Sequence, residues 1–293
     1  MNSKIKMNLY AFLTVLIWGS GFPFTRMIGD QISSYSLGFI RCFLSAAVLL
    51  AIGKVIRIRK PFCGKDLLWF FLSGALGFSL YFTLFSMGLE TISSATGSII
   101  TAMTPILVAI AAMKLYSERI NWIGWISIFC AFGGVVILLL WNGVLSINMG
   151  AAWMLLSAIA FAGYNLLNRK FAKSGYTDLE VATYSAVFGA IQTLVFLPRT
   201  IQDVLHADAA SNLSAVYLGA VAGAAAYYLW SKALALADRT SEVTNYLFVN
   251  PLIAAVIGFL MLREMPDLGT LVGGVIIIIS VVLFSTKGNP DQL

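Results

Sequence analysis

The stretch NPLIAAVIGFLMLRE at residues 250–264 has a proline at its second position, continues through apolar residues, and ends on an arginine and a glutamate. A closely similar stretch, TPILVAIAAMKLYSE, occupies residues 104–118. In both, twelve residues separate the proline from the final glutamate, and the two stretches lie 146 positions apart. Because the chain has only seven prolines and five glutamates, this agreement indicates an internal duplication.

Other short stretches recur at nearly the same offset. The triplet LFS at residues 84–86 recurs as LWS at residues 229–231, 145 positions later. Arg26 and Arg169, which each end an early apolar run, are 143 positions apart. The duplication is therefore expected to extend over the whole chain.

The composition excludes an ordinary water-soluble domain. Hydrophobic residues make up 59% of the chain, charged residues make up 11%, and the mean hydropathy is +0.88, whereas soluble domains carry about 25% charged residues. A transmembrane helix needs roughly 20 apolar residues, and the sequence contains ten such runs. They cover residues 7–29, 33–54, 66–89, 93–115, 121–141, 148–171, 176–197, 212–236, 240–262 and 267–286.

The basic residues predict the orientation of these runs in the membrane. Fifteen of the nineteen lysines and arginines fall on alternate connections that lie on one side, and only Arg26, Arg199 and Arg263 fall on the other. By the positive-inside rule the rich side is cytoplasmic. We therefore expect a multi-pass protein of the inner (plasma) membrane with both termini in the cytoplasm, and no nucleic acid is needed to explain the net charge of +6.

The number of runs predicts how the two copies are related. We expect a single membrane transport domain over residues 1–293, with internal repeats at 1–145 and 146–293. Each repeat contains five runs, which is an odd number, so the second copy enters the membrane from the opposite face. Inverted repeats of this kind are typical of secondary carriers, which expose a site near the midplane to either side in turn.

Several motifs resemble those of the EamA family of the drug/metabolite transporter superfamily. They are WGSGFPFTR at 18–26, IRCFLSA at 40–46, the segment 88–125 that contains the first proline phrase, and the second phrase at 250–264. Within the superfamily the chain most resembles the YddG-type amino acid exporters. FAGYNLLNR at 161–169 departs from the family pattern, because it lacks the Trp-Gly pair of the first opening motif.

The resemblance implies an all-α membrane protein in which ten transmembrane helices form a basket around a central cavity. The first, third, fourth, sixth, eighth and ninth runs would line the cavity, and the fifth and tenth would be peripheral. It also implies a small-molecule substrate. The expected partners are this substrate and the lipid bilayer, without nucleic acid, and a monomer is one expected state of the protein.

Aromatic and polar residues near the middle of the lining runs are candidates for substrate binding. Together they would form an aromatic chamber with a few amides, suited to a small zwitterion with an apolar side chain. For each of them alone, ordinary packing between helices is the plainer interpretation. The candidates are Trp18, Ser20, Tyr81, Phe85, Thr101, Tyr164, Asn165, Tyr227, Tyr228, Trp230, Asn245 and Tyr246.

Two prolines and three charged residues invite separate interpretations. Pro105 and Pro251 lie mid-run, where proline kinks a helix, and each is either a hinge or a fixed packing kink. Glu118 and Glu264 at run ends are expected to be structural rather than in contact with substrate. Arg41 lies inside a run that is not expected to line the cavity; it either attracts a substrate carboxylate or is structural, extending toward the interface or toward a backbone carbonyl.

The apolar runs lack several residue types on which particular functions depend, and this limits the functions to be considered. No Asp or Glu occupies the middle of a run, which disfavours proton-coupled export of cations through a central acid. No histidine lies within a run and no metal-binding spacing occurs, so an intramembrane enzyme is disfavoured and no cofactor or metal is expected. The sequence predicts a carrier that exports small amphipathic metabolites, above all aromatic or other neutral amino acids. Drugs, nucleosides or other metabolites are the alternative substrates, and a sensor or scaffold is the remote alternative.

Overall fold

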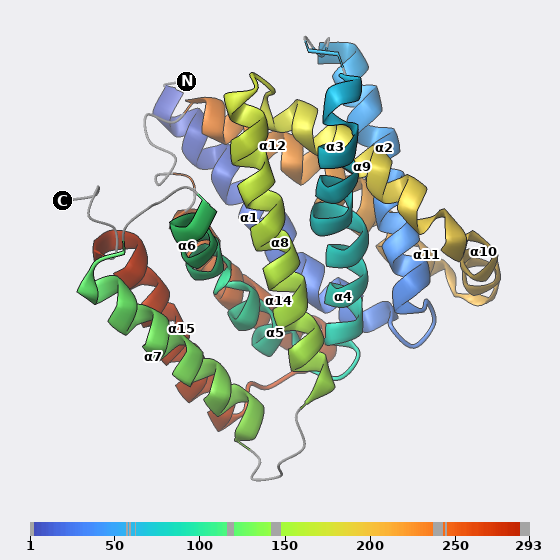
Figure 1. Ribbon diagram of the computed structural model, residues 1–293. Coiled ribbons are helices and arrows are strands. Elements are labelled where there is room, and N and C mark those ends of the chain that lie inside the picture. The colour runs from blue at the N-terminus through green and yellow to red at the C-terminus, as the bar shows by residue number, and fades with distance from the viewer. Residues whose placement is uncertain are drawn as a thin grey trace.

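A computed structural model describes residues 3–56, 58, 60–61, 63–115, 120–141, 148–236, 243 and 245–287. Within these ranges every regular element is helical (Figure 1). The first half contains α1 (Ser3–Ile28), α2 (Ser34–Ile56), η1 (Gly64–Asp66), α3 (Leu67–Gly74), η2 (Ala75–Ser79), α4 (Leu80–Leu89), α5 (Ser94–Thr101), α6 (Thr104–Leu115) and α7 (Trp122–Leu140). The second half contains α8 (Met149–Lys173), α9 (Asp178–Thr193), η3 (Leu194–Phe196), α10 (Leu197–His206), α11 (Ala209–Val216), η4 (Tyr217–Ala225), α12 (Ala226–Leu236), η5 (Asn245–Val249), α14 (Asn250–Leu262) and α15 (Leu268–Lys287).

Seven of the helices in the described ranges are long and apolar enough to cross a membrane. Three shorter apolar helices, Trp122–Gly134, Asn250–Leu262 and Leu268–Phe284, lie at places where further runs were expected. Large apolar side chains point outward, such as Phe129, Val195 and Leu213, which are 70%, 73% and 71% exposed. Such a surface suits contact with lipid rather than with water.

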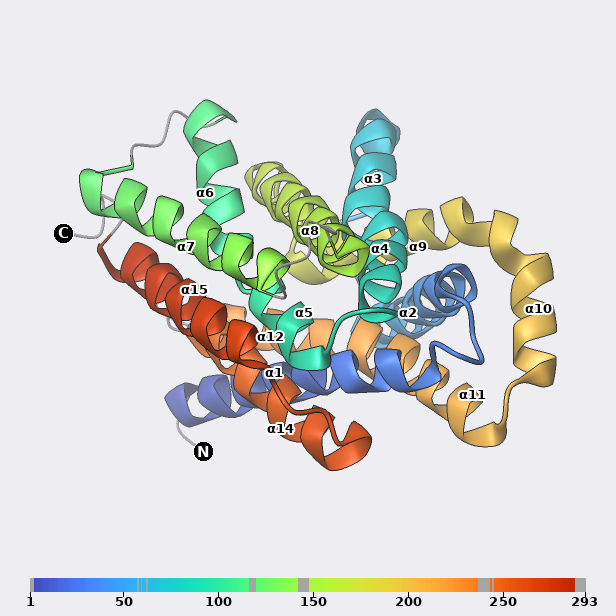
Figure 2. The ribbon, with the colours of Figure 1, turned by 90° about the horizontal axis from the view of Figure 1, so that it is seen from below.

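α1 and α8 each pack against helices of both halves, and one pair of helices lies at the edge. α7 and α15 lie side by side in both views (Figures 1 and 2), and α15 also packs against α5 and α6. α2 packs against α9, α1 packs against α12 and α14, and α8 packs against α4 and α6. Segments distant in sequence therefore meet throughout the centre of the molecule.

Side-chain caps explain where several helices begin. Thr177 and Glu180 form a capping box at the start of α9, with each side chain bonded to the other residue's backbone. Ser93, Asn121 and Asn148 cap α5, α7 and α8 in the same way, each accepting a hydrogen bond from a backbone amide. These short polar residues lie directly before the helices that they cap, so they fix where each of these helices begins.

Two spans contain a widened, π-helical section at corresponding places. The section Ala75–Ser79 divides α3 from α4, and the section Tyr217–Ala225 divides α11 from α12. At the offset of 145 that relates LFS to LWS, residues 75–79 correspond to residues 220–224. π-Helical turns are rare and occur frequently at functional sites.

Two further spans are interrupted directly before the proline of the repeated phrase. α5 ends at Thr101 and α6 begins at Thr104, and the hydroxyl of Thr104 donates to the Thr101 carbonyl at 2.7 Å. In the second half a 3-10 segment, Asn245–Val249, precedes α14. Each proline therefore lies in the first turn of a helix, where its missing amide hydrogen breaks no helical bond.

Glycines allow two close helix contacts at corresponding positions. A Cβ atom on Gly74 would lie 2.8 Å from the Ser185 carbonyl oxygen and 2.8 Å from the Gly189 nitrogen of α9. A Cβ atom on Gly219 would lie 3.1 Å from the Ile40 carbonyl oxygen and 2.8 Å from the Leu44 Cβ of α2. All members of the second contact are related to the first by the same 145-residue offset.

The contact at Gly74 predicts opposite effects for two glycine-to-alanine variants. Gly74→Ala forces a Cβ against backbone atoms that cannot rotate away, so we expect the free energy of unfolding to fall by about 1–3 kcal/mol. Gly133→Ala is the matched control, because nothing lies within 4 Å of its Cβ position. That variant should be neutral or stabilised by up to about 1 kcal/mol from helix propensity. Unfolding of the purified protein in detergent measures both, and equal stability of the two variants contradicts the contact.

One boundary differs from the expectation. The run 176–197 was expected to end before Pro198, but helical structure continues through η3 and α10 to His206. Pro198 lies in the first turn of α10, where proline is tolerated. Glu118 lies outside the described residues, and so does the side chain of Arg169.

Candidate functional site

An internal cavity of about 370 Å³ lies between helices of both halves. Its wall includes residues of α1, α2, α4, α5, α6, α8, η4, α12, η5 and α14. Seven of the twelve predicted binding residues line it: Trp18, Tyr81, Phe85, Thr101, Asn165, Tyr227 and Trp230. The cavity therefore brings together residues more than 200 positions apart.

Trp18 forms one aromatic corner of the wall. Its ring centroid lies 5.4 Å from that of Tyr227, edge to face, and 5.2 Å from that of Trp230. Its indole nitrogen donates to the carbonyl of Ala222 at 3.1 Å, within the π-helical section η4. The π turn thus supplies a backbone acceptor that holds the indole ring in place.

Tyr81 forms a second aromatic corner. Its ring stacks on Phe161 of α8 with centroids 4.8 Å apart and lies 5.8 Å from Phe85. Phe85 in turn lies 4.9 Å from Phe22 of α1. Phe22 and Phe161 were not predicted; both lie within the quoted opening motifs, which was the only signal for them.

The polar part of the wall comes mainly from the interrupted spans. Thr101 donates to the Ser98 carbonyl at 2.9 Å, and Asn165 donates to the Phe161 carbonyl at 2.7 Å. Thr104 and Asn250, the residues directly before the two prolines, also line the cavity. The Asn250 side-chain oxygen is buried and has no hydrogen-bond partner within the described part of the chain, so it can accept from a ligand.

Of the other five predicted residues, four are not part of the described wall. Ser20 is buried and bonded to the Tyr217 hydroxyl, and Tyr228 lies near Lys232 instead. Tyr246 packs in a small cluster with Met7 and Val243. The side chain of Asn245 lies outside the described residues.

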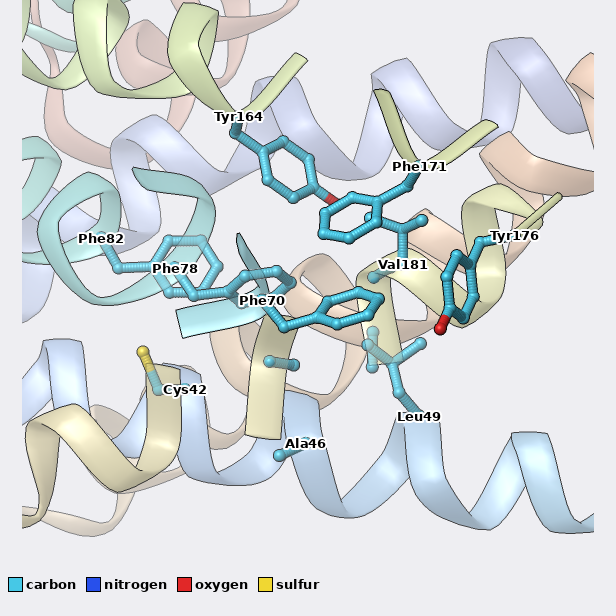
Figure 3. Close-up of a cluster of buried hydrophobic side chains, with 13 residues drawn as sticks. Cys42, Ala46, Leu49, Phe70, Phe78, Phe82, Tyr164, Phe171, Tyr176 and Val181 are labelled. Atoms are coloured by element: carbon cyan, nitrogen blue, oxygen red, sulfur yellow. The ribbon is translucent and has the colours of Figure 1, made fainter. Parts of the chain in front are cut away.

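Tyr164, the fifth, is a packing residue. It belongs to the buried cluster shown in Figure 3, with its ring 6.0 Å from that of Phe78 and packed over Gly77, whose Cβ position would be 2.3 Å from the ring. Phe161, three residues earlier on α8, lines the cavity in its place. The rotation of α8 decides which aromatic residue faces the cavity, and sequence alone does not reveal that rotation.

Arg41 corrects one expectation. The run that contains it was not expected to line the cavity, and this is wrong, because Arg41 of α2 is part of the wall. α2 packs against α4 and η4, which contribute wall residues themselves. A long side chain on α2 therefore reaches the cavity between these two neighbours.

A polar network joins four elements at the predicted outer face. The guanidinium of Arg26 pairs with the carboxylate of Glu264 and donates to the carbonyls of Leu89 and Ile92 at 3.0 Å and 2.6 Å. Glu264 also accepts from the backbone amide of Ser94 at 2.9 Å. The network ties the end of α1 to α14 and to the connection between α4 and α5. Glu264 is not part of the cavity wall.

The chain matches the model of the EamA-like transporter family twice, over residues 5–140 and 148–286. It belongs to this family. The match confirms the resemblance drawn from the motifs at 18–26, 40–46, 88–125 and 250–264.

Curated relatives of full length carry transporter names. The chain is 28% identical to the uncharacterized transporter YdfC of Bacillus subtilis, over 94% of this chain and 90% of that protein. It is 29% identical to a probable terminal-alkyne amino-acid exporter of Streptantibioticus cattleyicolor, over 94% and 92%. It is 26% identical to an S-adenosylmethionine uptake transporter of Rickettsia prowazekii, over 95% and 93%. The chain is therefore a membrane transporter by family.

A solved crystal structure shares the fold. It superposes with a TM-score of 0.62 over 94% of each chain, with 17% of residues identical. At this level of identity the likeness shows the fold alone.

Proposed function

We propose that this transporter is a secondary-type carrier that exports small amphipathic metabolites, amino acids above all, by alternating access. The observation that carries the proposal is the 370 Å³ cavity enclosed by helices from both halves of the chain. A cavity of this size holds a small metabolite. Its aromatic corners offer apolar surface, and its amides and hydroxyls offer hydrogen bonds.

The proposed architecture has ten spans in two inverted repeats. Four observations support this architecture. The family model matches the chain once in each half, and both halves contain a π-helical section, an interruption before a proline and a close glycine contact at corresponding positions. In Figure 1, α1 runs downward and α15 runs upward, as expected if both termini are cytoplasmic in the inner membrane. Inverted repeats allow one half to adopt the conformation of the other, which would expose the same cavity to the opposite side.

The direction of transport and the substrate are parts of the proposal. The names of the relatives include both an exporter of amino acids and uptake transporters. Export of amino acids is supported by the aromatic wall and by the exporter among the relatives. Drugs, nucleosides and other metabolites are the alternative substrates.

Flux through proteoliposomes tests the proposal. Vesicles containing the purified protein, loaded with radiolabelled L-phenylalanine, should release it in a saturable way that unlabelled substrate on the same side inhibits. Vesicles without protein should not. A complete lack of saturable flux for amino acids, nucleosides and other small metabolites contradicts the carrier function.

Two tyrosines distinguish a carrier from a sensor or scaffold. Tyr81→Ala and Tyr227→Ala each remove an aromatic contact from the cavity. We expect the KM or the relative rates among substrates to change about two- to tenfold, since such contacts contribute about 0.5–1.5 kcal/mol beyond their buried area. Tyr35→Ala is the control, because Tyr35 is 47% exposed and packs on Phe196. Unchanged kinetics in both cavity variants would argue that the cavity is not the transport site.

A further inference from the structure

Arg41 is a buried cation in the wall of an otherwise aromatic cavity. Its side chain comes from the middle of α2, and the residue is 5% exposed. The centre of its guanidinium lies 3.9 Å from the ring centroid of Phe82 and 5.3 Å from that of Phe85. The two rings hold the guanidinium at a defined place in the wall.

Two of the three nitrogens of this guanidinium carry hydrogens that no described residue accepts. Its Nε and Nη1 atoms are buried and have no hydrogen-bond partner among the described residues. None of the described residues that line the cavity is acidic, so no carboxylate of the described wall pairs with Arg41.

An unpaired buried charge is costly. Arginine removed from water loses hydration that contact with two phenyl rings does not replace, and a buried charge is ordinarily paired or hydrogen-bonded. Arg41 is the one cationic side chain among the described residues that line the cavity, and it lies there without such a partner. The missing partner is therefore expected to be an anion that enters the cavity.

We infer that Arg41 binds the carboxylate of the transported molecule. This inference rests on the proposed carrier function and names its substrate class: small carboxylates that bear an apolar or aromatic group. The guanidinium has a planar fork of N–H donors that matches a carboxylate in two-point geometry. The apolar group of the substrate lies among Trp18, Tyr81 and Phe22, which line the same cavity.

Among its described residues, the cavity wall offers no ion-pair partner for the amino group of a substrate. Amides and hydroxyls of Asn165, Asn250 and Thr101 can accept its hydrogen bonds, but no carboxylate among the described lining residues balances its charge. The carboxylate is thus required for recognition, and the α-ammonium group is not. Amino acids belong to the substrate class, whereas nucleosides and cationic amines do not.

Four matched probes test this assignment on the detergent-purified protein and in proteoliposomes. They are L-phenylalanine, which carries a carboxylate and an ammonium group, 3-phenylpropionate, which carries the carboxylate alone, and L-phenylalaninamide and 2-phenylethylamine, which carry the ammonium group alone on the same ring. Binding is followed by tryptophan fluorescence, because Trp18 and Trp230 line the cavity, and flux is followed by competition with radiolabelled L-phenylalanine. We expect the two carboxylates to bind at least tenfold more tightly than the amide and the amine.

Variants at position 41 provide a second test of the role of Arg41. Arg41→Met should weaken binding of both carboxylates at least tenfold and leave the weak binding of the amide unchanged, and Arg41→Lys should restore part of the affinity. Arg199→Gln is the matched control, because Arg199 lies on α10 with an exposed side chain and pairs with Asp203. If the Arg41 variants do not fold, the ligand series on the wild-type protein decides the question.

The outcomes separate this inference from the carrier function. Equal binding of L-phenylalanine and L-phenylalaninamide, or full carboxylate affinity in Arg41→Met, overturns the role of Arg41 while leaving a carrier. Saturable flux of nucleosides or amines without flux of carboxylates also overturns it and retains the carrier. Failure of every probe and every other metabolite to bind or move overturns both.

Discussion

In the Arg26→Gln variant, a cysteine placed at Thr101 in the cavity should react with a membrane-impermeant thiol reagent added outside about tenfold faster than it does with Arg26 present. We expect Arg26 to hold the predicted outer face closed, because it pairs with Glu264 and donates to the Leu89 and Ile92 carbonyls. Hydrogen bonds to charged groups contribute about 1.5–3 kcal/mol, and about 1.4 kcal/mol changes a two-state population tenfold.

The experiment needs a background without native thiols, because Cys63 and Cys130 are exposed. Cys42, Cys63 and Cys130 are therefore replaced by serine before the Thr101→Cys change is introduced. Arg263→Gln is the control, because it removes the same charge from the residue next to Glu264. Labelling rates that are equal in the Arg26 and Arg263 variants would show that the network does not close the outer face.

Glu264→Gln should have the same direction of effect. This variant weakens the pair with Arg26 but keeps an oxygen that can accept from the Ser94 amide. We expect a smaller increase in outside labelling than for Arg26→Gln, since only one part of the network is lost. A decrease would contradict the proposed arrangement of the outer face.

Replacement of Pro251 by alanine should lower the turnover rate of the carrier about tenfold or more. The 3-10 segment Asn245–Val249 ends where Pro251 begins α14, and this interruption places Leu247 and Asn250 in the cavity wall. Alanine supplies an amide hydrogen that can donate to the Leu247 carbonyl. A continuous helix is then favoured by up to about 3 kcal/mol, the cost of proline inside a helix.

The two interpretations of this proline predict different measurements. A hinge predicts that Vmax of proteoliposome flux falls while the dissociation constant of the substrate changes less. A fixed packing kink predicts altered stability with turnover close to that of the wild type. Pro198→Ala is the matched control, because Pro198 also lies in the first turn of a helix, α10, away from the cavity. Wild-type turnover in Pro251→Ala would exclude the hinge.

The spans were predictable because lipid imposes a simple pattern on the sequence. Runs at 7–29 and 33–54 were expected, and helices α1 and α2 occupy Ser3–Ile28 and Ser34–Ile56. Apolar length and short polar connections carry this information directly. The repeated proline phrase likewise predicted the place at which two spans depart from straight helices, since proline lacks the amide hydrogen that a continuous helix requires.

Local changes of helix type were not predictable. The π-helical sections at 75–79 and 217–225 contain no proline, and their sequences do not predict a π-helical turn. They depend on how neighbouring helices pack. The indole of Trp18, bonded to the Ala222 carbonyl, illustrates this, because its partner lies more than 200 residues away.

The candidate site was predictable by residue type but not by helix face. Tyr81 and Tyr227 line the cavity, whereas Tyr164 packs against Phe78 and leaves its expected place to Phe161. A hydrophobic transmembrane helix has apolar residues on every side, so its sequence does not reveal which side faces a cavity. Arg41 was noticed as an intramembrane charge, and only the packing of α2 against α4 and η4 shows that it reaches the wall.

The most direct test of a cavity that opens alternately is the reaction of one cysteine, at Thr101, from both faces of the membrane. Right-side-out and inverted vesicles present the outer and the inner face to the same impermeant reagent. We expect reaction from both faces, and we expect Arg26→Gln to raise the rate of reaction from outside while lowering the rate from inside. Reaction from one face only, or a rise of both rates together in the variant, would contradict this expectation.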